Sequence, residues 1–194
     1  MITRNFDNLM KFVFTGWNVV TNRIKTTEDT WKNGGIGIVK DINGDYSRIH
    51  SGDLTSNGLF GGTSDRYVVT NVVSPTMLVG SNDADESYDD YTISVLSSLT
   101  VLSDRGNAYT YSAENATLKM IKTFVNDTSD DITVSEVGIF KCLTTTTDTS
   151  STSSSRNFLL FREKLPEPVI LTANGGTATF TVTMNFPVAN KPNE

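Results

Sequence analysis

The residue types of a hydrolytic triad occur together at one place in the chain. His50, the only histidine, is followed by Ser51 and Asp53, and nucleophilic hydrolases combine these three groups. A triad serine normally stands on a tight turn between a strand and a helix, whereas the residues around His50 are typical of a loop. We therefore interpret His50 as an exposed loop histidine and predict that the chain is not an enzyme. The alternative is a small hydrolase in which His50 belongs to a catalytic triad.

One acidic segment resembles the start of a calcium-binding EF-hand loop. Asp41, Asn43 and Asp45 occupy alternate positions, as the first oxygen ligands of that loop do. However, Tyr46 stands at the sixth position, where the loop requires glycine, and Gly52 stands at the twelfth, where it requires glutamate. The sequence therefore excludes an EF-hand at this place.

A second acidic segment is denser. Asp83, Asp85 and Asp89 are candidate calcium ligands, because hard carboxylate oxygens are what that ion prefers, and Glu86 and Asp90 lie among them. A solvated acidic loop is the simpler interpretation and the one we prefer. We predict no cofactor and no other metal site.

Aromatic residues raise the hypothesis of glycan recognition. Tyr109 and Tyr111 share strand parity, so they would lie on one face of a strand. The other aromatic residues that could contribute to a sugar-binding face are Trp17, Trp31, Tyr46, Tyr67, Tyr88 and Tyr91. Packing in the core or at its rim is the commoner role of such residues.

Charge and composition argue against several classes of protein. The formal charge is -6 and no dense basic run exists, which argues against nucleic acid as a direct partner. Cys142 is the only cysteine, so an internal disulfide and a thiolate metal site are excluded; we interpret it as a half-buried strand residue. No apolar stretch is long enough to span a bilayer, and the first residues lack the pattern of a signal peptide.

The clearest structural pattern is the alternation of residues 177–186. Ala178, Phe180, Val182, Met184 and Phe186 have one parity, and threonine or asparagine fills the other. A period of two predicts a strand with one buried and one polar face. Such a strand needs neighbours to satisfy its backbone, so the pattern indicates a sheet.

Residues 5–14 show helical spacing instead. Phe6, Leu9, Met10 and Val13 recur on one face, and Gly16 is a plausible stop. A helix this short must dock on something to be stable. Packing on its own sheet and docking on a neighbouring subunit are both open.

The remaining segments predict further strands separated by turns. We expect a mainly β protein, an antiparallel β-sandwich or flattened barrel of about eight or nine strands with one short N-terminal helix. The predicted domain organisation is a docking helix at 1–16, a β-sandwich domain at 17–186 containing a Ser/Thr-rich loop at 144–155, and a tail at 187–194. The other predicted strands are 36–41, 67–73, 77–79, 91–103, 108–111, 116–126, 133–143 and 158–162, with turns at 43–44, 104–107, 126–131 and 174–176.

Two segments resemble virion proteins of tailed bacteriophages. Residues 77–81 and 89–93 are similar to a recurrent phage pattern of an apolar strand, Val-Gly-Ser/Thr-Gly, a variable loop and Asp-Tyr-x-Leu. Residues 133–140, 158–162 and the closing strand resemble the ending of phage neck, tail and fibre-associated proteins. Two departures are Asn82, where the pattern has glycine, and the length of the Ser/Thr tract.

The resemblance implies a structural component of a phage virion, assembled in the host cytoplasm and forming a ring or adaptor in the neck or tail. The implied partners are other copies of the chain and virion proteins such as portal, neck or tail components. The alternative is a fibre-associated or capsid-surface module that recognises host glycans. The interface candidates are Phe6, Leu9, Met10 and Val13 of the helix, Ser151 and Ser154 of the Ser/Thr tract, and the C-terminal tail.

Overall fold

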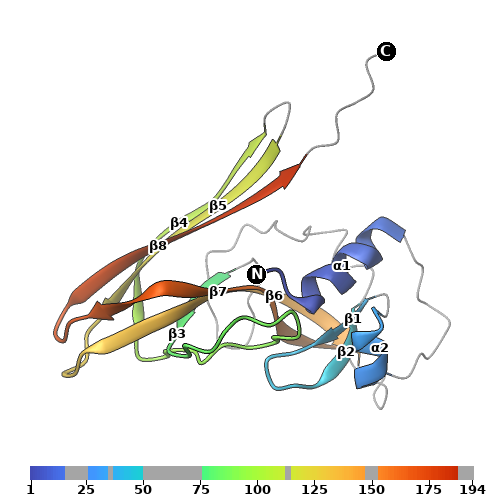
Figure 1. The fold of residues 1–194 in the computed structure, drawn as a ribbon, viewed down its shortest axis with the longest axis horizontal. Helices are drawn as coiled ribbons and strands as arrows, with labels where there is room; N and C mark the ends of the chain where they lie inside the picture. The colour runs from blue at the N-terminus through green and yellow to red at the C-terminus, as the bar shows by residue number, and fades with distance from the viewer. Residues whose placement is uncertain (16–25, 35–36, 50–75, 112–114, 147–152, 188–194) are drawn as a thin grey trace. The chain divides into compact units, whose positions relative to one another are not determined.

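The computed structural model describes residues 1–15, 26–34, 37–49, 76–111, 115–146 and 153–187 (Figure 1). The chain divides into two compact units, each assembled from segments that are distant in sequence. Unit 1 comprises Met1–Leu96 and Val134–Pro168, and unit 2 comprises Ser97–Thr133 and Val169–Glu194.

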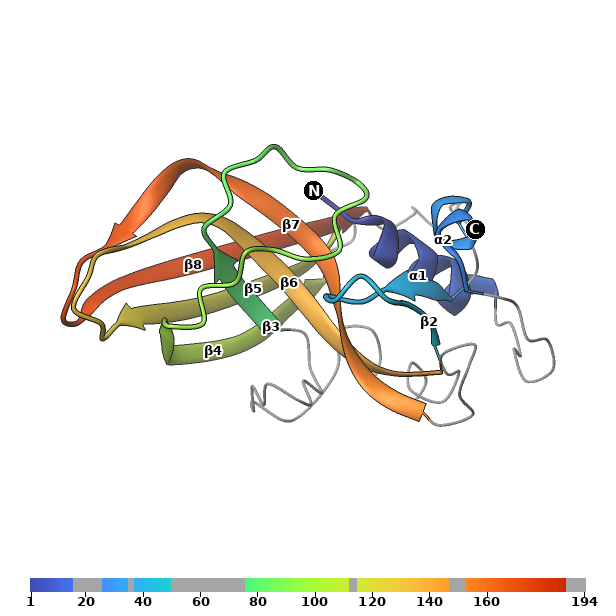
Figure 2. The same cartoon turned by 90° about the horizontal axis from the view of Figure 1, so that it is seen from below.

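Unit 1 combines a five-stranded sheet with two short helices. The strand order is β1-β2-β6-β3, and β7 also pairs with β6, so that the two longest strands lie alongside each other (Figure 2). Both strands continue beyond the boundary of unit 1 into residues of unit 2. The elements are α1 (Arg4–Thr15), α2 (Glu28–Lys32), β1 (Ile38–Lys40), β2 (Tyr46–Ile49), β3 (Thr76–Gly80), β6 (Ile132–Thr146) and β7 (Ser153–Leu171).

Buried apolar side chains hold the strands of unit 1 together. Ile93, Phe140 and Leu159 form one cluster, in which none of the three is more than 8% exposed. Gly138 lies against this cluster: a Cβ atom there would stand 2.8 Å from the Phe140 ring and 3.0 Å from Leu159. Only glycine fits at such a distance, so the cluster explains why an apolar strand contains one.

Two asparagines fasten α1 to the sheet. The Asn5 side chain accepts hydrogen bonds from Trp31 Nε1 at 2.9 Å and from the Lys40 amide at 2.8 Å, and it donates to the Lys40 carbonyl. Asn8 donates to the carbonyls of Trp31 and Ile38. Both asparagines are fully buried, so these bonds fix where the helix lies in a way that apolar contacts alone would not.

Unit 2 contains a three-stranded antiparallel sheet in the order β4-β5-β8. Pairing between β5 and β8 is unbroken over its full length, whereas the β4–β5 pairing shifts register twice. Phe180, Val182 and Met184 of β8 are buried and the threonines between them are exposed, which confirms the predicted alternation. The strands are β4 (Thr100–Tyr111), β5 (Asn115–Asn126) and β8 (Gly176–Pro187).

Asn126 closes one end of this sheet. Its Nδ2 donates to the carbonyls of Asp130 and Leu171 at 2.8 and 2.9 Å, and its Oδ1 accepts from the Thr128 amide at 3.0 Å. Asn126 is fully buried. One side chain therefore ties the 126–131 turn to the end of β7.

The predicted fold class is confirmed. The described residues form eight strands in antiparallel sheets, and these sheets are open, as in a sandwich, and not closed as in a barrel. The predicted helix at 5–14 is observed as α1. The strands predicted at 77–79, 116–126, 133–143, 158–162 and 177–186 lie within β3, β5, β6, β7 and β8.

Three local predictions were wrong. Residues 91–99 are mostly irregular, with one isolated bridge between Val95 and Gly80, because the Ser94 amide bonds a side chain and not a strand. Residues 104–107 continue β4, where a register shift absorbs the predicted turn. The predicted fold has one helix, whereas Glu28–Lys32 form a second helix, α2, which begins where the Thr27 side chain accepts from the Thr30 amide.

Other predictions lie outside the described residues or are met only in part. The strand at 67–73 and the centre of the Ser/Thr tract, 147–152, are among the residues left undescribed, while the ends of the tract extend β6 and β7. The helix predicted as a separate docking element belongs to unit 1. Within the described residues, neither helix has the length and apolar character to cross a membrane.

Candidate functional site

A buried ion pair joins the two longest strands of unit 1. Glu136 on β6 is fully buried and Arg162 on β7 is 3% exposed. Arg162 Nε donates to Glu136 Oε2 at 2.7 Å. Charged side chains are rarely buried to this extent unless their partners satisfy them, so this pair is the natural centre from which to trace the site.

The rest of the Arg162 guanidinium binds the acidic loop, which we define as residues 81–90. Its Nη1 donates to Asp90 Oδ2 at 2.7 Å and to the Asp85 carbonyl at 3.2 Å, and its Nη2 donates to the Ala84 carbonyl at 3.0 Å. Burial works against the positive charge, but the Asp90 and Glu136 carboxylates outweigh it and hold the pKa of Arg162 above its ordinary value. Arg162 therefore acts as a permanent cation around which the loop is wrapped.

The second oxygen of Glu136 holds the base of the same loop. Glu136 Oε1 accepts from the Ser94 amide at 2.8 Å and from the Asn82 amide at 3.2 Å. Gly80 lies directly against this carboxylate, and a Cβ atom there would also stand 2.8 Å from the Ser94 carbonyl. We call the group formed by Gly80, Asp90, Glu136 and Arg162 the loop clamp.

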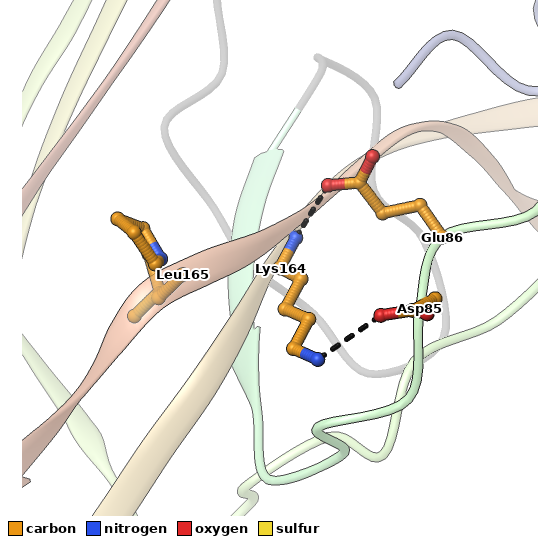
Figure 3. Close-up of a pocket in the computed structure, with 5 residues that line it drawn as sticks. Asp85, Glu86, Lys164 and Leu165 are labelled. Atoms are coloured by element: carbon orange, nitrogen blue, oxygen red, sulfur yellow. Dashed lines mark hydrogen bonds and ion pairs between the residues drawn. The ribbon is translucent and has the colours of Figure 1, made fainter.

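The outer side of the clamped loop borders an open pocket of about 430 Å³. The Lys164 amide donates to Glu86 Oε1 at 2.8 Å, and Lys164 Nζ lies 3.2 Å from Asp85 Oδ1 (Figure 3). Leu165 and Pro166 complete the lining. The Asp85 side chain is 98% exposed, so its contact with Lys164 is a surface ion pair that contributes little to stability.

The three candidate calcium ligands of the acidic loop do not converge. Asp83 is exposed, Asp85 pairs with Lys164, and Asp89 accepts from Arg4 Nε at 2.6 Å. No group of three or more acidic, histidine or cysteine side chains that could hold a metal ion occurs among the described residues. In this structure the acidic loop pairs with the basic side chains of Arg4, Arg162 and Lys164.

The start of α1 lies beside the same loop. Arg4 stands 4.3 Å above the centre of the Tyr88 ring, and the Tyr88 hydroxyl donates to Asp7 Oδ2 at 2.7 Å. Burial, followed by this hydrogen bond, raises the pKa of Tyr88 to about 12. A hydrogen bond from Lys11 is the main reason that the pKa of Asp7 is lowered.

The structure corrects part of the predicted interface. Phe6 and Leu9 are 8% and 0% exposed inside unit 1, so neither can be a contact residue for a neighbour that docks on the folded unit. Met10 is half-buried and stays a candidate. The side chains of Val13, Ser151 and Ser154 lie outside the described residues, and so does the tail beyond residue 187.

The structure describes only some of the residues that we considered for a catalytic triad or a sugar-binding face. His50 lies outside the described residues, so the triad hypothesis is not addressed. Trp31 is 1% exposed and its indole binds Asn5, which makes it a core residue and not part of a sugar-binding face. The side chains of Tyr109 and Tyr111 are not described, and glycan recognition stays a prediction.

The loop clamp itself was not predicted as a site. Its signal was present: Glu136 interrupts an apolar strand segment and Arg162 ends one, and a charge on the buried face of a strand requires a partner. The hydrogen bonds described for the clamp leave no carboxylate oxygen of Glu136 without a donor. Chemically, the arrangement is suited to holding a loop rigidly.

Comparison with known proteins does not assign this chain to a family. No protein-family model, no curated protein and no solved structure matches this chain.

Proposed function

We propose that this chain is a structural component of a bacteriophage virion, forming a ring or adaptor in the neck or tail. The observation that carries the proposal is the loop clamp. Gly80 and Asp90 come from the first phage-like segment, and Glu136 and Arg162 come from the second. These residues lie up to 82 positions apart in the sequence, yet they meet in one buried network.

The meeting of the two segments supports the resemblance in a specific way. The matched residues of the two segments contact one another in the folded unit. Here Arg162 bonds both Glu136 and Asp90, and Gly80 is the residue that leaves room for Glu136. The matched residues thus depend on one another, as residues of a single structural motif do.

The proposed role is non-catalytic and resides in the virion. The clamp holds the acidic loop through charge pairs, and Asp89 of that loop pairs with Arg4 at the start of α1, which suits a protein that serves as a fixed part of an assembly. The proposed partners are further copies of the chain and portal, neck or tail proteins.

Exposed apolar side chains of unit 2 are candidate contacts for such partners. Leu102 on β4 and Ile170 on β7 are each 62% exposed, and Val101 and Val169 beside them are 42% and 36% exposed. Large apolar residues that face water mark a contact surface when they gather. Each pair is consecutive on a strand, where successive side chains point to opposite faces, so each of the four side chains is a separate candidate contact.

Quantitative mass spectrometry of purified particles tests the proposal. The chain should be present in a fixed copy number per particle, and its absence from intact particles would refute the proposal. Removing residues 1–15 would be a poor test, because this segment contributes Phe6 and Leu9 to the interior of unit 1.

Single charges at exposed apolar positions give a cleaner test. Leu102→Asp and Ile170→Asp should fold normally and enter particles less well than the parent chain. Ser98→Asp is the matched control, since it adds the same charge at an exposed polar position of unit 2. Equal incorporation of all three variants would exclude these side chains as contacts.

A further inference from the structure

The open edge of β8 is the unusual feature of unit 2. β8 lies at the end of the β4-β5-β8 sheet and pairs with β5 along its full twelve residues. Among the described residues, no strand pairs with its other edge. A long strand edge of this kind presents a row of backbone donors and acceptors that another strand can bind.

Natural edge strands usually carry devices that prevent such pairing, such as charges, bulges, interior proline or short length. β8 has no charged residue and no proline before Pro187. Its register with β5 is continuous, without a bulge.

The opposite edge of the sheet differs in each respect. β4 contains Asp104 and Arg105 and shifts register twice against β5. The sheet is therefore protected at β4 and unprotected at β8. This asymmetry indicates that β8, and not β4, is the edge that meets another strand.

We propose that β8 pairs with β8 of a second copy of this chain, in antiparallel orientation about a two-fold axis. An interface of this type places the same patch on both subunits. Uncharged, unbulged edges satisfy that condition, because no like charges face each other across the axis. An axis through Thr181 pairs Gly176 with Phe186 and overlaps eleven of the twelve residues of β8.

In the enlarged sheet, the polar face of one β8 would continue the polar face of the other, and the apolar face would continue the apolar face. Residues of equal parity face each other when the axis passes through a residue position, so exposed threonines such as Thr179 and Thr183 meet threonines. Buried side chains such as Phe180 and Val182 extend one apolar face. Threonine pairs and aromatic or β-branched pairs are favourable cross-strand neighbours.

Cysteine cross-linking tests the pairing directly. In a Cys142→Ser background, single cysteines replace Thr179, Thr181 or Thr183, and the proteins are oxidised alone and in pairwise mixtures. Directly facing strand residues have Cα atoms about 4.5–5.5 Å apart, within the range of a disulfide. We expect one combination within β8 to give covalent dimers in high yield.

A charge substitution with a register-matched control gives the second measurement. Thr181→Lys should raise the dissociation constant of the dimer at least about tenfold, because like charges then face each other across the axis. Ile121→Lys is the control: Ile121 is the β5 residue that pairs with Thr181, so it carries the same charge one strand away from the edge. Sedimentation equilibrium of the full chain measures both constants.

Three results would overturn the proposal. The first is a monomeric parent chain at every concentration studied. The second is a dimer with no cross-link within β8. The third is preferential cross-linking of the β8 cysteines to a cysteine at Val101 on β4, which would mean head-to-tail pairing. The proposal stands independently of the virion role, since a chain that is monomeric in solution can still be counted in particles.

Discussion

Neutralising Glu136 should destabilise unit 1 more than any other single isosteric change in the acidic network. Glu136→Gln keeps the shape of the side chain but removes the buried negative charge that faces Arg162 at 2.7 Å. It also places an NH₂ group where one oxygen accepts hydrogen bonds. Breaking a buried ion pair by removing one partner costs about 3–5 kcal/mol.

The structure places this variant at the lower end of that range. Arg162 keeps its bond to Asp90, which is only 22% exposed, and its bonds to two backbone carbonyls. The guanidinium is therefore not left wholly unpaired. We expect a loss of about 3 kcal/mol, which corresponds to a fall of about 1.5 M in the urea midpoint for an m-value of about 2 kcal/mol/M.

Tryptophan fluorescence makes the assay specific. Trp31 is 1% exposed inside unit 1, so its emission follows the unit that contains the clamp. Amide hydrogen exchange adds a local readout, because the Ser94 amide donates directly to Glu136 Oε1 and should lose protection.

The control uses the exposed ion pair of the same loop. Asp85→Asn removes a carboxylate that is 98% exposed, and such surface pairs contribute about 0–1 kcal/mol. If Glu136→Gln changed the midpoint no more than Asp85→Asn does, the clamp could not be what holds the loop, and the reasoning from burial would be refuted.

Three further changes test other parts of the structure. Gly80→Ala places a methyl group against the Ser94 carbonyl and the Glu136 side chain, so urea unfolding should show a loss of about 2 kcal/mol; an unchanged midpoint would show that the space is larger than described. Asn126→Ala removes the side chain that ties the end of unit 2 together and should cost about 1–3 kcal/mol by circular dichroism. The pKa of Tyr88 is raised to about 12. The protonated Tyr88 hydroxyl therefore contributes its full stabilisation below about pH 10, and this stabilisation is lost as the pH rises toward 12. In an alkaline absorbance titration the midpoint of Tyr88 should fall in Asp7→Asn, and an unchanged midpoint would contradict the hydrogen bond.

Period-two patterns predicted the strands of this protein well. Residues 177–186 alternate without interruption, and β8 buries one parity and exposes the other. The pattern is reliable because it reflects a backbone property: successive side chains of a strand point to opposite faces. The helical spacing of Phe6 and Leu9 was equally informative about α1.

Local patterns failed where a distant side chain took over a backbone group. Residues 91–99 alternate as a strand would, but the Ser94 amide is bound by the Glu136 carboxylate and little of the predicted pairing forms. Asp104 and Arg105 suggest a turn, yet β4 continues through them: Asp104 pairs with Lys122 of β5, and Arg105 lies in the register shift that follows. Neither outcome is visible within the short segment concerned.

The strand-rich class and the apolar face of each long strand can be predicted from the sequence, because both follow from side-chain alternation along one segment. That Gly80, Asp90, Glu136 and Arg162 form one group is a result of the fold. Their meeting depends on how β3, β6 and β7 pair, and strand pairing joins residues whose separation in the chain carries no signal of their contact. A buried charge in an apolar strand indicates that a partner exists, and the fold determines which residue that partner is.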